Sequence, residues 1–294
     1  MVAPRREFRL PADASTHARV AVIVPSYRDG ELAAEAVASI DEDEPVEIVV
    51  VDDGSPDDGT RRALDAVTGA RVVRHEQNHG LIATRMTGLA ETAAPYVFPL
   101  DADDQAAPGA LAAMADILDA DPRLDVCFGD YVEFGTQNVV RAVPDSLDPY
   151  RLAYTNEYPV SALFRRTALD AVDGWRAAGF AEPAYADWNL WIALAESGAC
   201  GAHLGRGRLT FRKRFHEGRM LDEARRRHHL MYRDLRRAHP AFFGEIAAHR
   251  RRSDLSLSRK ALYPIVYGRR RRFPRFERKV KLMLDRLNVW TLRR

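Results

Sequence analysis

The feature that most constrains the fold of this chain is a series of short apolar segments that alternate with amphipathic ones. Each apolar segment is too short for a helix, whereas the amphipathic segments repeat with helical spacing. The apolar segments lie at 19–24, 46–51, 70–75 and 96–100, and the amphipathic ones at 31–40, 60–68, 81–93 and 108–119. Strands that are apolar on both faces belong in a parallel sheet that is covered on both sides. We therefore predict an α/β fold, a Rossmann-like sandwich whose mainly parallel sheet carries helices on both faces.

Beyond residue 125 the alternation becomes irregular. Further strands are predicted at 126–133, 137–142, 199–204 and 208–215, and helices at 167–172 and 187–197. From residue 220 onward the pattern indicates arginine-rich helices. We divide the chain into a polar arm (1–18), a main domain (19–219, with halves 19–125 and 126–219) and a basic helical extension (220–294).

Composition excludes several classes of protein. No apolar run approaches the ~18 residues of a membrane span, and no apolar h-region precedes Val20, so we expect no secretory signal. The two cysteines, Cys127 and Cys200, are far apart, which argues against a disulfide framework or a zinc module and fits a cytoplasmic location. No glycine-rich phosphate loop follows the first apolar segment, which disfavours a dinucleotide-dependent oxidoreductase and a P-loop kinase.

Charge is distributed unevenly along the chain. The net charge is +2, but residues 1–205 carry a balance of −18 and residues 206–294 a balance of +20. The acidic part suits cations and the basic part suits anions. A nucleic-acid-binding protein that uses the basic part is one alternative function, although the acidic part would repel nucleic acid.

Carboxylates gather where a ligand should bind. Ligands of open α/β sheets lie beyond the carboxyl ends of the strands. These ends read Pro25-Ser26-Tyr27, Asp52-Asp53-Gly54 and Asp101-Ala102-Asp103-Asp104. Acids at a phosphate site require a divalent cation between them and the phosphates, and Mg²⁺ or Mn²⁺ is the usual ion.

These motifs carry a family resemblance. The sequence resembles the family 2 inverting nucleotide-sugar glycosyltransferases of the GT-A fold, and the match spans most of residues 19–216. The matching stretches are Val22–Tyr27, Val49–Ser55, Asn78-His79-Gly80 with Arg85, Leu100–Asp104 and Ala186–Trp191.

The resemblance implies a nucleotide-sugar donor site. It places Pro25 and Tyr27 at the nucleotide, where Tyr27 stacks on the base. Asp52 or Asp53 accepts a hydrogen bond from the ring N–H of the base. Arg85 reaches the base or the phosphates.

The resemblance also implies a metal and a general base. Asp101 and Asp103 form the DXD motif, in which one residue contacts the ribose and the other holds Mn²⁺ or Mg²⁺; Asp104 shares that task. His216 matches a late histidine that some relatives place on the metal. Asp187 matches the general base that deprotonates the acceptor hydroxyl for a single, inverting displacement.

Two departures and several structural alternatives stand beside this interpretation. The position before the base is usually acidic but is Ala186 here, and the usual Ala-Arg-Asn run reads Thr84-Arg85-Met86. The aspartates at the strand ends can serve as turn and cap residues, and Asp187 can cap its helix. A surface position is an equal alternative for His216.

The sequence therefore predicts a metal-dependent inverting glycosyltransferase. Its donor is a nucleotide sugar, with UDP-sugars favoured, and its acceptor is a hydroxyl of a saccharide or a lipid-linked molecule in cell-surface polysaccharide or glycoconjugate synthesis. A sugar nucleotidyltransferase is the alternative enzyme, but the glycine-rich loop with a basic residue that this class needs does not follow the first strand.

The end of the basic extension has an amphipathic pattern. Its apolar residues recur at helical spacing among lysines and arginines; they are Val280, Met283, Leu284, Leu287 and Trp290. One interpretation is a helix that packs on the main domain or on a second subunit in a homo-oligomer. The other is a peripheral contact with the anionic inner face of the membrane.

Overall fold

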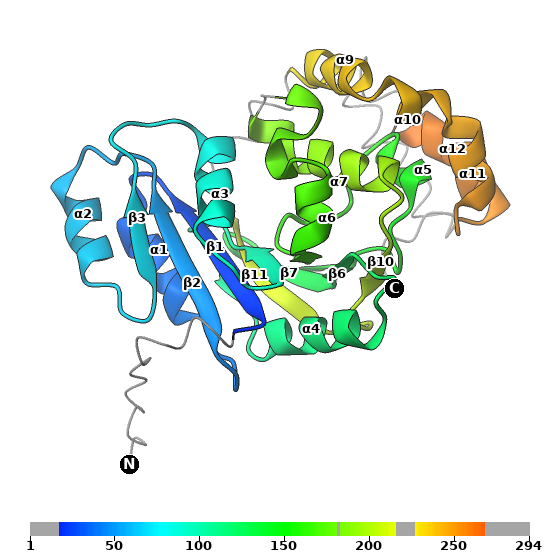
Figure 1. The fold of residues 1–294 in the computed structure, drawn as a ribbon. Coiled ribbons are helices and arrows are strands. Elements are labelled where there is room, and N and C mark those ends of the chain that lie inside the picture. Colours follow the sequence, from blue (N-terminus) through cyan, green and yellow to red (C-terminus); the bar gives the residue numbers. More distant parts are fainter. Residues whose placement is uncertain (1–17, 181–182, 216–226, 268–294) are drawn as a thin grey trace.

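Two β-sheets form the centre of the molecule in the computed structural model, which describes residues 18–180, 183–215 and 227–267 (Figure 1). The larger sheet has the strand order β10-β6-β9-β4-β1-β2-β3. Its strands are β1 (Val20–Ser26), β2 (Val46–Asp52), β3 (Arg71–Arg74), β4 (Tyr96–Pro99), β6 (Val126–Phe128), β9 (Leu163–Arg165) and β10 (Gly201–His203). All neighbours pair in parallel except β9, which is antiparallel to β4 and β6. The mainly parallel sheet is therefore confirmed.

The smaller sheet joins the end of β4. It has the order β5-β11-β7-β8 and consists of β5 (Gln105–Ala106), β7 (Asp130–Gly135), β8 (Val139–Arg141) and β11 (Leu209–Phe215). Only residues 100–104 separate β4 from β5, so the turn that carries the acidic motif lies between the two sheets.

Helices cover both faces of the larger sheet, as the apolar strands require. One face is covered by α1 (Gly30–Ala38), α2 (Asp58–Asp65) and α4 (Ala110–Ala120), and the other by α3 (Leu81–Ala90), α6 (Arg166–Ala171) and α7 (Ala186–Glu196). The first core lies under α1, α2 and α4 and contains Val22 and Val24 of β1. The second core lies under α3, α6 and α7 and contains Ile23, because successive side chains of a strand point to opposite faces.

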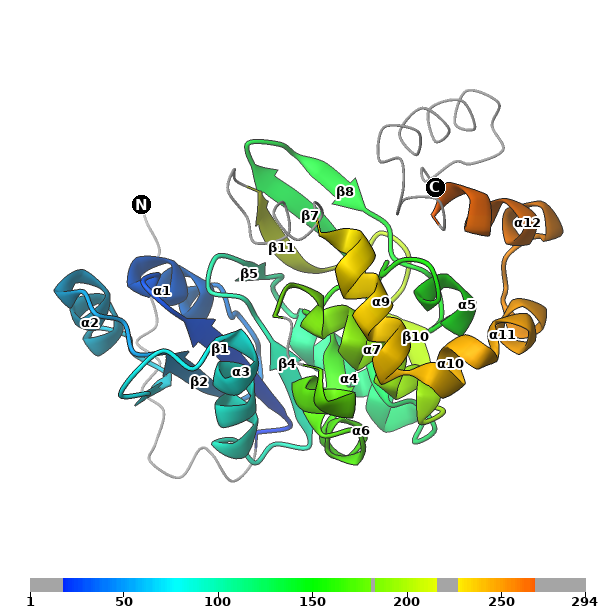
Figure 2. The ribbon, with the colours of Figure 1, turned by 90° about the horizontal axis from the view of Figure 1, so that it is seen from above.

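The first helices of the basic extension share the second core. They are α9 (His228–Ala238) and α10 (Pro240–Gly244), followed by α11 (Ile246–Arg252) and α12 (Leu257–Val266). Tyr232 of α9 packs on Trp188 of α7 with ring centroids 5.5 Å apart, and α9 lies across α7 in Figure 2. A short α5 (Pro149–Leu152) supports the same side. Among the helices of the described ranges, none is long and apolar enough to cross a membrane.

Candidate active site

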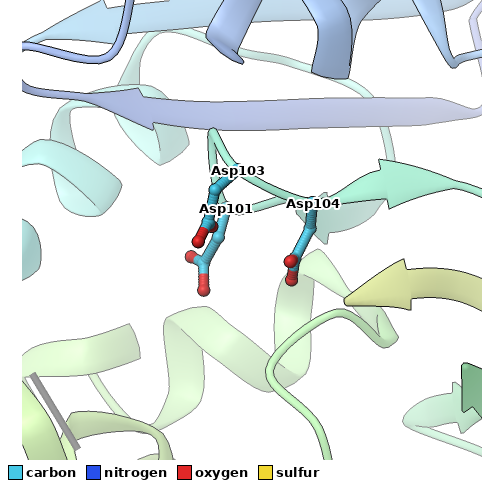
Figure 3. A group of neighbouring side chains, drawn as sticks. All are labelled: Asp101, Asp103 and Asp104. Atoms are coloured by element: carbon cyan, nitrogen blue, oxygen red, sulfur yellow. The ribbon is translucent and has the colours of Figure 1, made fainter. Parts of the chain in front are cut away.

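The candidate site lies at the carboxyl ends of β1, β2 and β4, where the sequence predicted it. The turn after β4 brings Asp101, Asp103 and Asp104 together, and one oxygen of each lies within 4.8 Å of the others (Figure 3). The backbone N–H of Asp104 donates to the Asp101 carbonyl at 2.9 Å, which closes the turn. From the second sheet, the Arg214 N–H donates to Asp104 Oδ1 at 2.8 Å. Local sequence and sheet pairing thus fix the cluster together.

Burial and neighbouring charges shift the pKa values of Asp104 and Asp101 in opposite directions. Burial and the charges of Asp101 and Asp103 raise the pKa of Asp104 well above its usual range, against the opposing charge of Lys213. Burial also disfavours the charged form of Asp101, but Arg85 and Lys213 outweigh it and lower its pKa. Asp104 Oδ2 is buried without a hydrogen-bond partner. An all-oxygen group with excess negative charge matches the ligands that Mg²⁺ and Mn²⁺ prefer.

Arg85 connects this cluster to Asp187. Its Nη2 donates to Asp101 Oδ1 at 2.7 Å, and its Nη1 donates to Asp187 Oδ1 at 2.6 Å. Its side chain is 1% exposed, whereas those of Asp101 and Asp187 are 27% and 33% exposed. The two carboxylates are therefore partly open to solvent, and the guanidinium that joins them is buried.

Asp187 occupies the first turn of α7. The helix begins after Tyr185, and its N-terminus has no side-chain cap, so the carboxylate of Asp187 is bonded to Arg85 instead of capping the helix. Burial raises the pKa of Asp187, and the nearby charge of Asp101 adds to this, while Arg85 opposes it. A raised pKa makes a carboxylate a stronger base.

The two acids at the end of β2 have different partners. Asp53 accepts hydrogen bonds from the backbone N–H groups of His79 and Gly80 and from His75 Nδ1, each at 2.8 Å. Asp52, the last residue of β2, is 2% exposed; it accepts one from the Ser55 N–H at 3.0 Å, and Arg74 Nε lies 3.8 Å from its Oδ2. Asp53 thus holds the turn that precedes α3, and Asp52 holds the end of β2.

The remaining predicted residues lie near the same edge or outside the described ranges. Tyr27 follows β1 and is 38% exposed, as a stacking surface requires. Pro25 lies within β1, opposite Val51 of β2. His216 and the apolar positions 280–290 fall outside the described residues.

The sequence predicts Trp175 as part of the core or of a pocket wall, but it does not predict Lys213 as a contributor to the site. Lys213 of β11 lies near Asp104, Asp101 and Asp187, whose charges raise the pKa of its ammonium although burial opposes this. Trp175 packs beside Arg85, with the guanidinium carbon 5.7 Å from the ring centroid. A basic residue in the strand 208–215 was the only local signal for Lys213.

Comparison with known proteins decides the family. The model of the family described as glycosyl transferase family 2 matches residues 21–173, which include both acidic motifs and Arg85. The chain belongs to glycosyl transferase family 2. The predicted family, GT-A-like fold and enzyme class are confirmed.

A curated relative and a solved structure are similar to this glycosyltransferase. It is 43% identical to the succinoglycan biosynthesis protein ExoU of Rhizobium meliloti (strain 1021) over 96 residues, which are 31% of this chain and 28% of ExoU. The matched segment thus spans less than a third of that curated relative. The fold of this chain resembles that of S. aureus TarS 1–349 in complex with UDP-GlcNAc, with a TM-score of 0.60 and 20% identity over 91% of this chain and 77% of the TarS 1–349 chain.

Proposed function

We propose that this glycosyltransferase takes its sugar from a UDP-sugar and transfers it, with a bound divalent metal ion, to a hydroxyl group with inversion at the anomeric carbon. The observation that carries the proposal is the position of Asp187, a single guanidinium away from the acidic cluster. An in-line displacement needs a base on one side of the sugar and charge compensation at the leaving diphosphate on the other.

The acidic cluster supports the metal. Asp101, Asp103 and Asp104 supply only oxygen ligands, and Asp104 Oδ2 has no partner in the described structure. Bound Mn²⁺ or Mg²⁺ would neutralise the charge that develops on the diphosphate. Lys213 adds a fixed positive charge at the same place.

Asp187 supplies the base. Arg85 holds Oδ1 of its carboxylate, which leaves Oδ2 for the acceptor hydroxyl. Its raised pKa favours proton abstraction from an alcohol that becomes acidic only as the bond to carbon forms. The product then carries the inverted configuration, because one displacement occurs.

The uridine nucleotide is supported by the likeness to TarS, which was solved with UDP-GlcNAc and with UDP. Tyr27, which is 38% exposed, offers the stacking face for the base. The name of ExoU supports a role in polysaccharide synthesis and therefore a saccharide or lipid-linked acceptor.

A panel of nucleotide sugars tests the proposal. We expect release of UDP from a UDP-sugar in the presence of Mn²⁺, and little release of dTDP or GDP. Asp103→Ala and EDTA should each abolish turnover, whereas Asp121→Ala, outside the site, should not. Full activity in EDTA would contradict the metal assignment, and turnover of only dTDP- or GDP-sugars would contradict the UDP assignment.

The basic extension supports a peripheral contact with an anionic membrane on the cytoplasmic side. The last turn of α11 carries the exposed Arg250, Arg251 and Arg252, and in the next helix Leu257 is 85% exposed and Ile265 42% exposed. Each basic residue near an anionic leaflet contributes ~1 kcal/mol, and salt screens this attraction.

Sedimentation with vesicles tests the membrane contact. The full chain should bind phosphatidylserine vesicles at low salt, leave them at high salt and ignore phosphatidylcholine vesicles. Truncation after Pro264 removes the amphipathic positions 280–290 but keeps Arg250–Arg252, so it should weaken binding while donor hydrolysis persists. Failure to bind at low salt would make the extension a packing or dimerisation element.

A further inference from the structure

The geometry of Arg85 is that of a residue that positions other side chains, and not of a residue that binds the nucleotide-sugar donor. Each of its terminal nitrogens is bonded to a different carboxylate, Asp101 or Asp187, and these lie 16 and 102 residues away in the sequence. At 1% exposure, the guanidinium offers almost no surface to a bound molecule. A donor that binds here meets the two more exposed carboxylates first.

The surroundings of Arg85 fix it from behind. The Trp175 ring, itself fully buried, lies beside the guanidinium, and Nε is buried without a hydrogen-bond partner. The backbone of α3 is anchored at its start, because Asp53 binds the Gly80 N–H. Arg85 is therefore held by packing and by its two ion pairs.

We infer that Arg85 is a positioning residue that locks the base Asp187 to the first aspartate of the DXD motif; this rests on the proposed function. Two carboxylates bonded to the same guanidinium would repel each other without it, and the positive charge of the guanidinium between them removes that repulsion. Its planar fork also sets the direction of both carboxylates, which a lysine ammonium, a point charge on a flexible stem, cannot do. The base is thereby held at a fixed distance from the donor site.

This role makes a specific prediction for combined mutations. A residue that acts only through Asp187 loses its effect once Asp187 is no longer a base, so the losses do not multiply. A residue that contacts the donor independently gives losses that do multiply. The cycle of Arg85→Lys, Asp187→Asn and the double variant separates the two cases.

The experiment measures kcat for transfer, KM for the donor and the Kd of UDP with Mn²⁺ by calorimetry. Arg85→Lys should lower kcat by ~10²-fold, and Asp187→Asn by ~10²–10⁴-fold, while the Kd of UDP changes less than about fivefold. The double variant should lie within about threefold of the less active single variant. Arg85→Gln, which keeps a planar group but one donor nitrogen, replaces Arg85→Lys if the latter fails to fold.

A matched control is available on the same side of the sheet. Arg166 donates through all three of its guanidinium nitrogens, to Ala94 O, Leu89 O and Thr92 Oγ1, whereas Arg85 donates through two. Arg166→Lys should lower stability but keep kcat, because none of its partners belongs to the candidate site.

Two results would overturn the inference while the proposed function stands. One is a kcat loss in the double variant equal to the product of the single losses, and the other is a more than tenfold weaker UDP affinity in Arg85→Lys with kcat retained. A wild-type enzyme that turns over no nucleotide sugar would instead refute the proposed function and, with it, the inference.

Discussion

Substitution of Asp53 by asparagine separates structural support from donor binding. The carboxylate is 3% exposed and accepts three hydrogen bonds, from His79 N, Gly80 N and His75 Nδ1, each 2.8 Å long. Asparagine keeps the shape but removes the charge, and it places an NH₂ group against at least one of these N–H donors. The turn before α3 then loses its anchor.

The magnitude follows from the hydrogen bonds. Each bond to a charged group contributes roughly 1.5–3 kcal/mol, and the substitution abolishes one of the three and weakens the others. We expect a loss of about 2–4 kcal/mol in the free energy of unfolding, which lowers Tm by about 3–7 °C for a chain of this size. Thermal and urea unfolding measure it.

The pH dependence gives a second readout. Burial opposes the charge of Asp53, but the hydrogen bonds from His79, His75 and Gly80 outweigh it and lower its pKa. A carboxyl with a lowered folded pKa stabilises the fold above its unfolded pKa, near 4, and this contribution is lost as pH falls through the folded value. The difference between wild type and Asp53→Asn should therefore be full at pH 7 and shrink below about pH 4.

Asp57→Asn is the matched control, because Asp57 is exposed and caps α2 by accepting a hydrogen bond from the Thr60 N–H. It should cost much less stability. The reasoning fails if Asp53→Asn unfolds at the wild-type temperature. If Asp53→Asn keeps the wild-type unfolding temperature but loses UDP affinity, Asp53 is the base contact that the family resemblance implied.

Three further outcomes are expected. Gly88→Ala should lower Tm by several degrees, because the new Cβ clashes with Ile23 Cγ2 where α3 packs on β1, and overpacking costs ~1–3 kcal/mol; an unchanged Tm would contradict this packing. In iodoacetamide labelling of the native protein, the exposed Cys200 should react and Cys127 should not, because burial raises the pKa of the Cys127 thiol to about 12; labelling of both would place β6 outside the core. As the pH is lowered, the kcat of transfer should begin to fall at a pH above the usual aspartate range, because Asp187 must be ionised and burial raises its pKa. A kcat that falls only below about pH 4 would argue for another base.

The sequence by itself determined the sheet and the place of the site. Continuous apolar segments such as 46–51 can be satisfied only by a sheet that is buried on both faces, and parallel strands bring their carboxyl ends to one edge. The sequence alone therefore predicts that Asp52, Asp53 and the cluster at 101–104 lie close together. The motif Ala186–Trp191 identifies Asp187, and the helical pattern of residues 187–197 places it in the first turn of a helix.

Only the tertiary structure decided the partners of these acids. The bonds from Arg85 to Asp101 and Asp187 join segments that no local periodicity relates, because they depend on how α3 and α7 pack on the same face of the sheet. The antiparallel β9 and the position of Lys213 were missed for the same reason. Pairing across a sheet is set by long-range contacts, whereas the pattern within a segment reports only which of its faces is buried.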